Sequence, residues 1–68
     1  MKLSQLKLKR LIAGYSQTEL AEVLGVTPGS VSQWETGRTY PSVKRLKKLS
    51  EVLDIPVEEI IELEEKVG

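Results

Sequence analysis

The feature that most constrains this chain is the link Gly25-Val26-Thr27, which joins two short helical segments. The segment before the link begins near Ser16, and the segment after it carries Pro28 at its first position. A link of three residues cannot turn one helix back along another, so the two helices must cross at a steep angle. The sequence therefore predicts a helix-turn-helix unit in the middle of the chain.

Proline and glycine divide the chain into five short helical segments, with no strand-like alternation between them. Ser16 and Glu19 form a capping box that begins the second segment, while Thr27 and Ser42 cap the third and the fourth. Gly25 supplies a left-handed exit from the second segment. The segments cover about residues 3–13, 16–24, 27–36, 41–53 and 57–66. We expect an all-α fold in which residues 1–68 form a single five-helix domain.

The chain of 68 residues contains neither cysteine nor histidine. Disulfides, thiolate metal sites and the usual zinc ligand sets are therefore excluded, as is the side chain that most often transfers protons near neutral pH. No apolar run is long enough to span a bilayer, and the amino end lacks a signal-peptide pattern. We expect a soluble, cytoplasmic domain with no metal, no small-molecule cofactor and no membrane partner.

The formal net charge is zero, but the charges are divided along the chain. Residues 1–48 carry nine Lys and Arg against three acids, a net charge of +6, and residues 49–68 carry one Lys against seven acids, a net charge of −6. This division fits a domain of which one part meets a polyanion, and it fits equally well solvated helix faces that differ in sign. Four of the bases surround the fourth segment, so they cannot all face one partner: Lys44, Arg45, Lys47 and Lys48.

Apolar residues hold the third segment on one side only. Val31 and Trp34 share a stripe, and Leu20, Leu24 and Val26 meet them across the link, so we interpret Trp34 as a core residue. A helix anchored on one face, with short hydrogen-bonding residues on the other, can enter a major groove. The residues on that other face are Thr27, Pro28, Gly29, Ser32 and Gln33.

The motifs of this region resemble those of the phage repressor and Cro family, also called XRE-like. The resemblance covers about residues 6–63 and is carried by Ser16-Gln17-x-Glu19-Leu20-Ala21-x-x-Leu24-Gly25-Val26-Thr27, by Val31-Ser32-x-Trp34-Glu35-x-Gly37 and by Pro41-Ser42. It implies a lambda-repressor-like DNA-binding domain and a prokaryotic or phage-encoded, nucleoid-associated transcriptional regulator, usually a repressor. It also implies double-stranded DNA as the partner, bound at a palindromic operator by a homodimer whose third helix reads the bases.

The resemblance also assigns residues to the DNA backbone. Gln17 matches a phosphate contact at the positive end of the second helix, and Lys44 would extend the contact strip into the fourth. Arg10 and Glu35 match a pair that bridges the first helix to the end of the recognition helix, and an arginine on an otherwise apolar stripe does need a partner. The whole set expected at phosphates is Arg10, Gln17, Thr36, Arg38, Thr39, Tyr40 and Lys44.

One departure from the family pattern affects base reading. Related domains usually place long donors such as Gln at the first two positions of the recognition helix, where this chain has Pro28 and Gly29. Direct reading would then rest on Gln33, Ser32 and Thr27, with Ser30 as a further candidate and Pro28 against a thymine methyl. We therefore expect DNA shape to supply more of the discrimination than in related domains.

The fifth segment carries more apolar residues than one helix face needs. We expect Val57 and Ile61 in the core, and a second stripe that is either a frayed end or a partner surface. The residues of this stripe are the first candidates for dimer contacts: Ile60, Leu63 and Val67. If the stripe belongs to the core, Leu8 and Ile12 of the first segment are the next candidates.

Two other classes of function stand beside DNA binding. A domain of this fold can act mainly as a protein partner, for example as an antitoxin-like protein that neutralises another protein through its fifth helix. An enzyme is not expected, because the chain has a single Asp, no His, no Cys and no Gly-rich phosphate loop.

Overall fold

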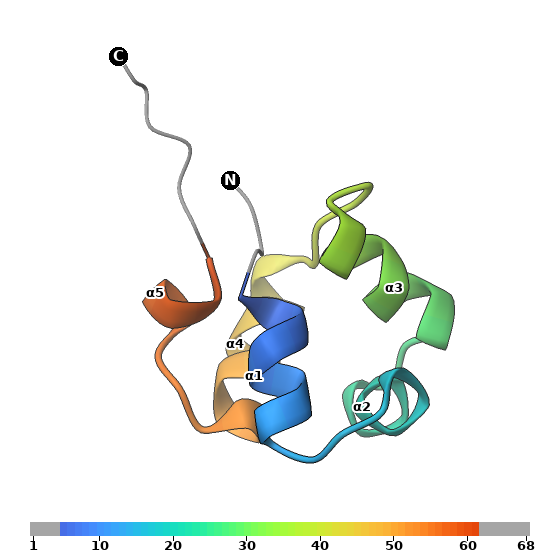
Figure 1. The fold of residues 1–68 in the computed structure, drawn as a ribbon. Helices are drawn as coiled ribbons and strands as arrows, with labels where there is room; N and C mark the ends of the chain where they lie inside the picture. The colour runs from blue at the N-terminus through green and yellow to red at the C-terminus, as the bar shows by residue number, and fades with distance from the viewer. Residues whose placement is uncertain (1–4, 62–68) are drawn as a thin grey trace.

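The computed structural model describes residues 5–61, and the only regular elements among them are helices (Figure 1). Helix α1 spans Leu6–Ile12, α2 spans Gln17–Leu24, α3 spans Pro28–Thr36, α4 spans Val43–Leu53 and α5 spans Val57–Ile60. The expected all-α fold is therefore confirmed. None of the five helices in the described range has the length and hydropathy that crossing a membrane requires.

Side-chain caps start the helices at the residues that the sequence predicts. At α2, the Ser16 hydroxyl accepts from the Glu19 backbone N–H at 3.0 Å, and Glu19 Oε1 accepts from the Ser16 N–H at 2.9 Å. This is the expected capping box. The hydroxyls of Thr27 and Ser42 accept in the same way at the starts of α3 and α4. Local hydrogen bonding therefore fixes where three of the helices begin.

One glycine allows the abrupt change of direction between α2 and α3. Gly25 has a φ of 74°, in the left-handed region that side chains with a Cβ rarely adopt. The next residue, Val26, donates its N–H to the Ala21 carbonyl at 3.0 Å and packs its side chain against the core. Figure 1 shows α2 almost end-on while α3 runs across the view, so the two helices cross steeply.

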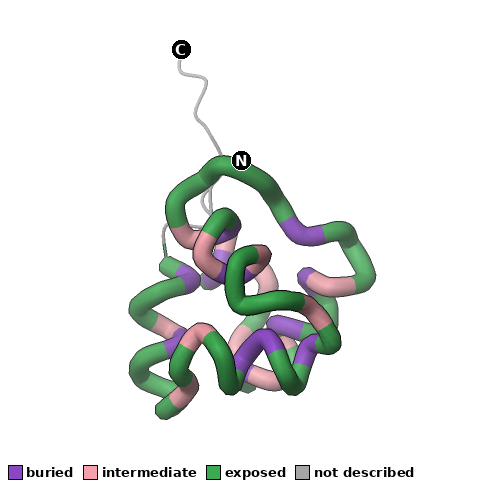
Figure 2. Tube along the Cα trace, turned by 90° about the vertical axis from the view of Figure 1, so that its right-hand side faces the viewer, coloured by how far each residue is buried: buried purple, intermediate pink, exposed green. Residues whose placement is uncertain are grey.

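The core takes side chains from all five helices. Leu6 of α1, Leu20 of α2, Val31 of α3 and Leu49 of α4 are fully buried, and Ile60 of α5 joins them. Figure 2 shows buried positions spread along the described chain, with exposed positions between them. Other buried apolar residues belong to the same core cluster, among them Trp34, Leu46 and Leu53.

The prediction that the fifth segment carries a partner surface is wrong at Ile60, the one residue of that stripe within the described range. Helix α5 is a single turn, because Ile61 already has extended backbone angles (φ −95°, ψ 132°), so the helix ends at Ile60 rather than near Lys66. Ile60 lies three residues after Val57 and so shares its face, and it is fully buried in the core. Ile60 is therefore not available for dimer contacts. Leu63 and Val67 lie outside the described residues.

Candidate nucleic-acid interface

Helix α3 has one buried side and one exposed side. Val31 and Trp34 are buried in the core, which fixes the helix against α2 and α1. Pro28, Gly29 and Gln33 are exposed on the outer side, as is the capping residue Thr27, and Ser32 is half-buried. The structure thus places the five sequence-predicted base-reading residues at the outer side and the start of one helix, where all but Ser32 are exposed.

The loop after α3 folds back onto the end of that helix. The Gln33 carbonyl accepts from the backbone N–H groups of Arg38 at 2.9 Å and Thr39 at 3.4 Å, and from the Thr36 hydroxyl at 3.2 Å. The Thr39 hydroxyl also donates to Gln33 Oε1 at 3.4 Å. Residues 36–40 are exposed, and they form the long exposed stretch at the top of Figure 2. The loop residues expected at phosphates therefore lie beside Gln33.

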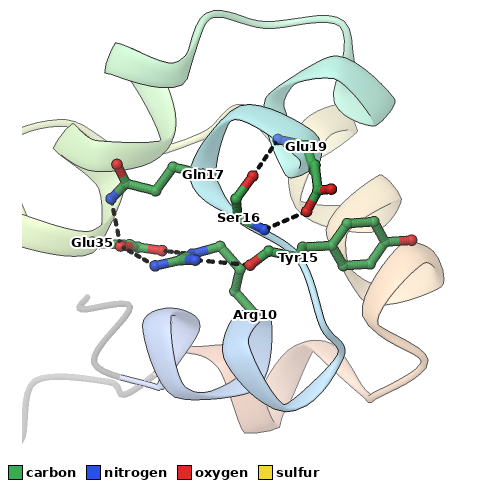
Figure 3. Close-up of polar contacts among 6 residues, drawn as sticks. All are labelled: Arg10, Tyr15, Ser16, Gln17, Glu19 and Glu35. Carbon is green, nitrogen blue, oxygen red and sulfur yellow. Dashed lines mark hydrogen bonds and ion pairs between the residues drawn. The ribbon is translucent and has the colours of Figure 1, made fainter.

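Beneath this surface, a network of polar contacts joins three helices (Figure 3). Arg10 Nε donates to Glu35 Oε2 at 2.5 Å, and another guanidinium nitrogen donates to Glu35 Oε1 at 3.3 Å. The third nitrogen donates to the Tyr15 carbonyl at 2.8 Å. The two charged side chains are only 6% and 5% exposed. Each charge is thus compensated inside the domain, and α1 is tied to the last turn of α3.

The assignment of Arg10 to a phosphate is wrong. All three of its guanidinium nitrogens donate within the protein, and the side chain is buried beneath the surface that a duplex would touch. Arg10 therefore supports the interface from below. The resemblance placed it in the phosphate-contacting set, and its burial excludes it from that set.

Gln17 lies at the first position of α2 and is half-buried. Its Nε2 donates to Glu35 Oε1 at 2.9 Å, so Glu35 accepts from both Arg10 and Gln17 (Figure 3). Its backbone N–H is one of those at a helix start that have no partner within the helix. The sequence did not predict the hydrogen bond between Gln17 and Glu35, because no local pattern relates residues that lie 18 positions apart.

Helix α4 adds a second contact that the sequence did not predict. Arg45 donates from a guanidinium nitrogen to the Leu24 carbonyl at 3.0 Å, which satisfies an oxygen in the last turn of α2. Lys44, in the first turn of α4, is exposed. Of the four bases around α4, Arg45 thus stabilises the fold, while Lys44 is exposed at the surface.

The sequence matches a family model described as helix-turn-helix over residues 6–60, a range that covers all five helices. The chain belongs to the XRE-type helix-turn-helix family. The members of this family that the chain resembles are named as transcriptional regulators, and none of these names describes an enzyme.

Three relatives illustrate the match. A prophage-derived uncharacterized regulator of Bacillus subtilis, YonR, is 39% identical over 75% of this chain and 47% of its own length. The transcriptional activator BcrR of Enterococcus faecalis is 35% identical over 90% of this chain and 31% of its own length. An uncharacterized regulator of Sinorhizobium medicae is 35% identical over 79% of this chain and 39% of its own length. The chain therefore spans about a third to a half of these relatives. No solved structure matches it significantly.

Proposed function

We propose that this chain binds a specific site on double-stranded DNA with α3 in the major groove, and that it represses transcription by occupying that site. The observation that carries this proposal is the two-sidedness of α3, where Val31 and Trp34 are buried while residues 27–29 and Gln33 are exposed. Short side chains on the outer side let the helix backbone come close to base edges. Occupation of the operator is enough to exclude other proteins from the same duplex.

Gln33 is the long side chain of this outer side, and its surroundings favour a role as donor. Its Oε1 already accepts from the Thr39 hydroxyl at 3.4 Å, which leaves its Nε2 hydrogens for the DNA. Guanine O6 and N7 and thymine O4 are acceptors in the major groove, so we expect Gln33 to read one of these. Pro28 offers an apolar contact to a thymine methyl, while Thr27 and Ser32 add short hydroxyls.

Residues that surround the reading side would hold the phosphates. They come from the first turn of α2, from the last residue of α3 and the loop that follows it, and from the first turn of α4. Two of them, Arg38 and Lys44, are exposed cations, and the backbone N–H groups at the start of α2 add the positive end of a helix. The proposed set is Gln17, Thr36, Arg38, Thr39, Tyr40 and Lys44.

The proposed functional unit is a homodimer on a palindromic operator. One recognition helix covers only a few base pairs, which is too little to select one site from a genome. A two-fold pair of domains doubles the contacts and sets the two α3 helices about 34 Å apart, one turn of the duplex.

Selection of bound duplexes from a random pool tests the proposal. We expect enrichment of a palindrome whose half-sites are centred about 10 base pairs apart. If the protein retained random duplexes but enriched no sequence, site-specific reading by α3 would be contradicted.

A further inference from the structure

The outer side of α1 is apolar and exposed. Leu8, Leu11 and Ile12 are 52%, 55% and 70% exposed, and they make up half of the six large apolar side chains that lie exposed within residues 5–61. Their spacing of three and four residues places them on one face. Leu6 and Arg10 point the opposite way, into the domain. Helix α1 therefore has apolar residues on both sides, as is typical of a helix that is covered on both sides.

Neither the core nor the proposed DNA surface uses this face. In Figure 1, α2 and α3 form the right-hand side of the domain, whereas α1 lies in front of α4. The side that carries α3 is thus a different side from the one on which α1 is exposed. A duplex bound along α3 would leave the outer face of α1 on the flank of the domain, where another protein could reach it.

We propose that Leu8, Leu11 and Ile12, here called the α1 surface, form the contact with a second copy of this chain. The inference rests on the proposed function, since it places the interface of the homodimer that binds the operator. A two-fold interface uses the same patch on both copies, so that patch must be complementary to itself.

Charges of both signs border the α1 surface, which makes it suitable for self-association. Lys7 is exposed on α1 next to the apolar residues. Lys9 pairs with Glu59 at 3.5 Å, which brings the exposed acids of α5, Glu58 and Glu59, to the side of α1. A two-fold axis through the apolar residues allows bases of one copy to approach acids of the other. The whole chain has a formal net charge of zero, so two copies do not repel each other strongly.

The size of the α1 surface predicts a weak dimer. A stable interface buries about 800 Å² on each partner, which is more than three partly exposed side chains supply. Two copies should therefore associate weakly in solution and pair tightly only when a palindrome holds both of them, because DNA binding and dimerisation are then linked.

The test is the double variant Leu8→Gln/Ile12→Gln, which removes apolar surface without changing the charge that phosphates meet. The matched control is Val23→Gln, at an apolar residue of α2 that is 47% exposed. Sedimentation measures self-association, and titration with a palindrome and with a single half-site measures cooperative binding and intrinsic binding. We expect the double variant to weaken self-association at least tenfold and to abolish cooperativity, with half-site affinity unchanged within twofold. The control should behave as wild type.

A second measurement uses the absence of cysteine from the chain. Single Leu8→Cys, Leu11→Cys and Ile12→Cys variants each carry one thiol, and at least one should form an intermolecular disulfide under mild oxidation on the palindrome. Val23→Cys should not, because a disulfide needs Cα atoms within about 7 Å.

Three results would overturn the inference. The first is a double variant that associates and cooperates like wild type. The second is a double variant that unfolds, because the α1 surface would then be packed against its own chain. The third is a wild-type protein that fills the two half-sites independently. Loss of all duplex binding by wild type would instead contradict the proposed function, and the half-site titration distinguishes that case.

Discussion

The layer beneath the proposed DNA surface and that surface itself are built from opposite kinds of contact. Beneath it, Arg10 and Glu35 share hydrogen bonds of 2.5 and 3.3 Å, and both side chains are almost completely buried. On the surface, residues 27–29 are exposed, and the Gln33 side chain accepts a long hydrogen bond, of 3.4 Å, from the Thr39 hydroxyl. The difference teaches that the lower layer fixes the position of α3, whereas the outer residues other than the helix cap Thr27 can change without loss of the fold.

The largest expected effect comes from the lower layer. Glu35→Ala leaves the Arg10 guanidinium buried without its counter-ion and removes the acceptor of Gln17. We expect the free energy of unfolding to fall by about 3–5 kcal/mol, a large part of the stability of a small domain. Urea unfolding measures it, and Glu22→Ala, at an exposed acid of α2, should cost less than about 0.5 kcal/mol. A double-mutant cycle with Arg10→Ala should give a coupling well above the ~0.2–1 kcal/mol of an exposed pair. Additive effects would mean that the two residues do not interact.

The second largest effect is expected on the outer side of α3, where a substitution should change DNA binding and leave stability almost unchanged. Gln33→Ala should cost about 1–3 kcal/mol of binding free energy at one base-pair position and relax the preference there. The free energy of unfolding should stay within about 0.5 kcal/mol of wild type, because the side chain is exposed. Competition among single-base variants of the selected operator measures the preference. An equal loss on every sequence would make Gln33 a residue that contacts the backbone instead.

A substitution at Gly29 should move stability and binding in opposite directions. A Cβ at Gly29 would meet nothing closer than Thr27 Oγ1 at 3.8 Å, and its φ is not positive, so the fold does not require glycine there. Gly29→Ala should therefore stabilise the domain by about 0.5–1 kcal/mol. The same methyl should weaken duplex binding if α3 lies close against the DNA. Gly25→Ala, at φ 74°, is the contrasting variant and should destabilise the fold. Unchanged DNA affinity in Gly29→Ala would show that the start of α3 does not approach the duplex closely.

The sequence predicts those features that depend on neighbours along the chain. The Ser16–Glu19 capping box and the left-handed Gly25 follow from residues within one turn of each other, and the structure confirms both. The extent of the fifth helix did not follow in this way. Periodicity alone offered two apolar stripes, and only packing against the rest of the domain decides that Ile60 is buried.

Contacts between distant residues mark the other limit of the sequence. The Arg10–Glu35 pair was expected from the family resemblance and from the position of an arginine on an apolar stripe, and Arg10 was also placed at a phosphate, where its burial excludes it. The Gln17–Glu35 and Arg45–Leu24 contacts join residues 18 and 21 positions apart, and no local pattern predicts them. The fold decides which polar groups form hydrogen bonds inside the domain and which stay exposed, where DNA could contact them.

The smallest expected effect tests DNA binding itself most directly. Duplex affinity should be measured as a function of salt concentration for wild type and for Arg38→Ala, at an exposed base in the loop beside Gln33. If basic residues neutralise phosphates, the logarithm of the wild-type affinity should fall linearly with the logarithm of salt concentration, despite the zero net charge of the chain. Arg38→Ala should make this slope shallower by about one unit and weaken binding alike on operator and random duplexes. Wild-type binding that does not depend on salt, or no binding to any duplex at low salt, would contradict the proposal that this protein acts on DNA.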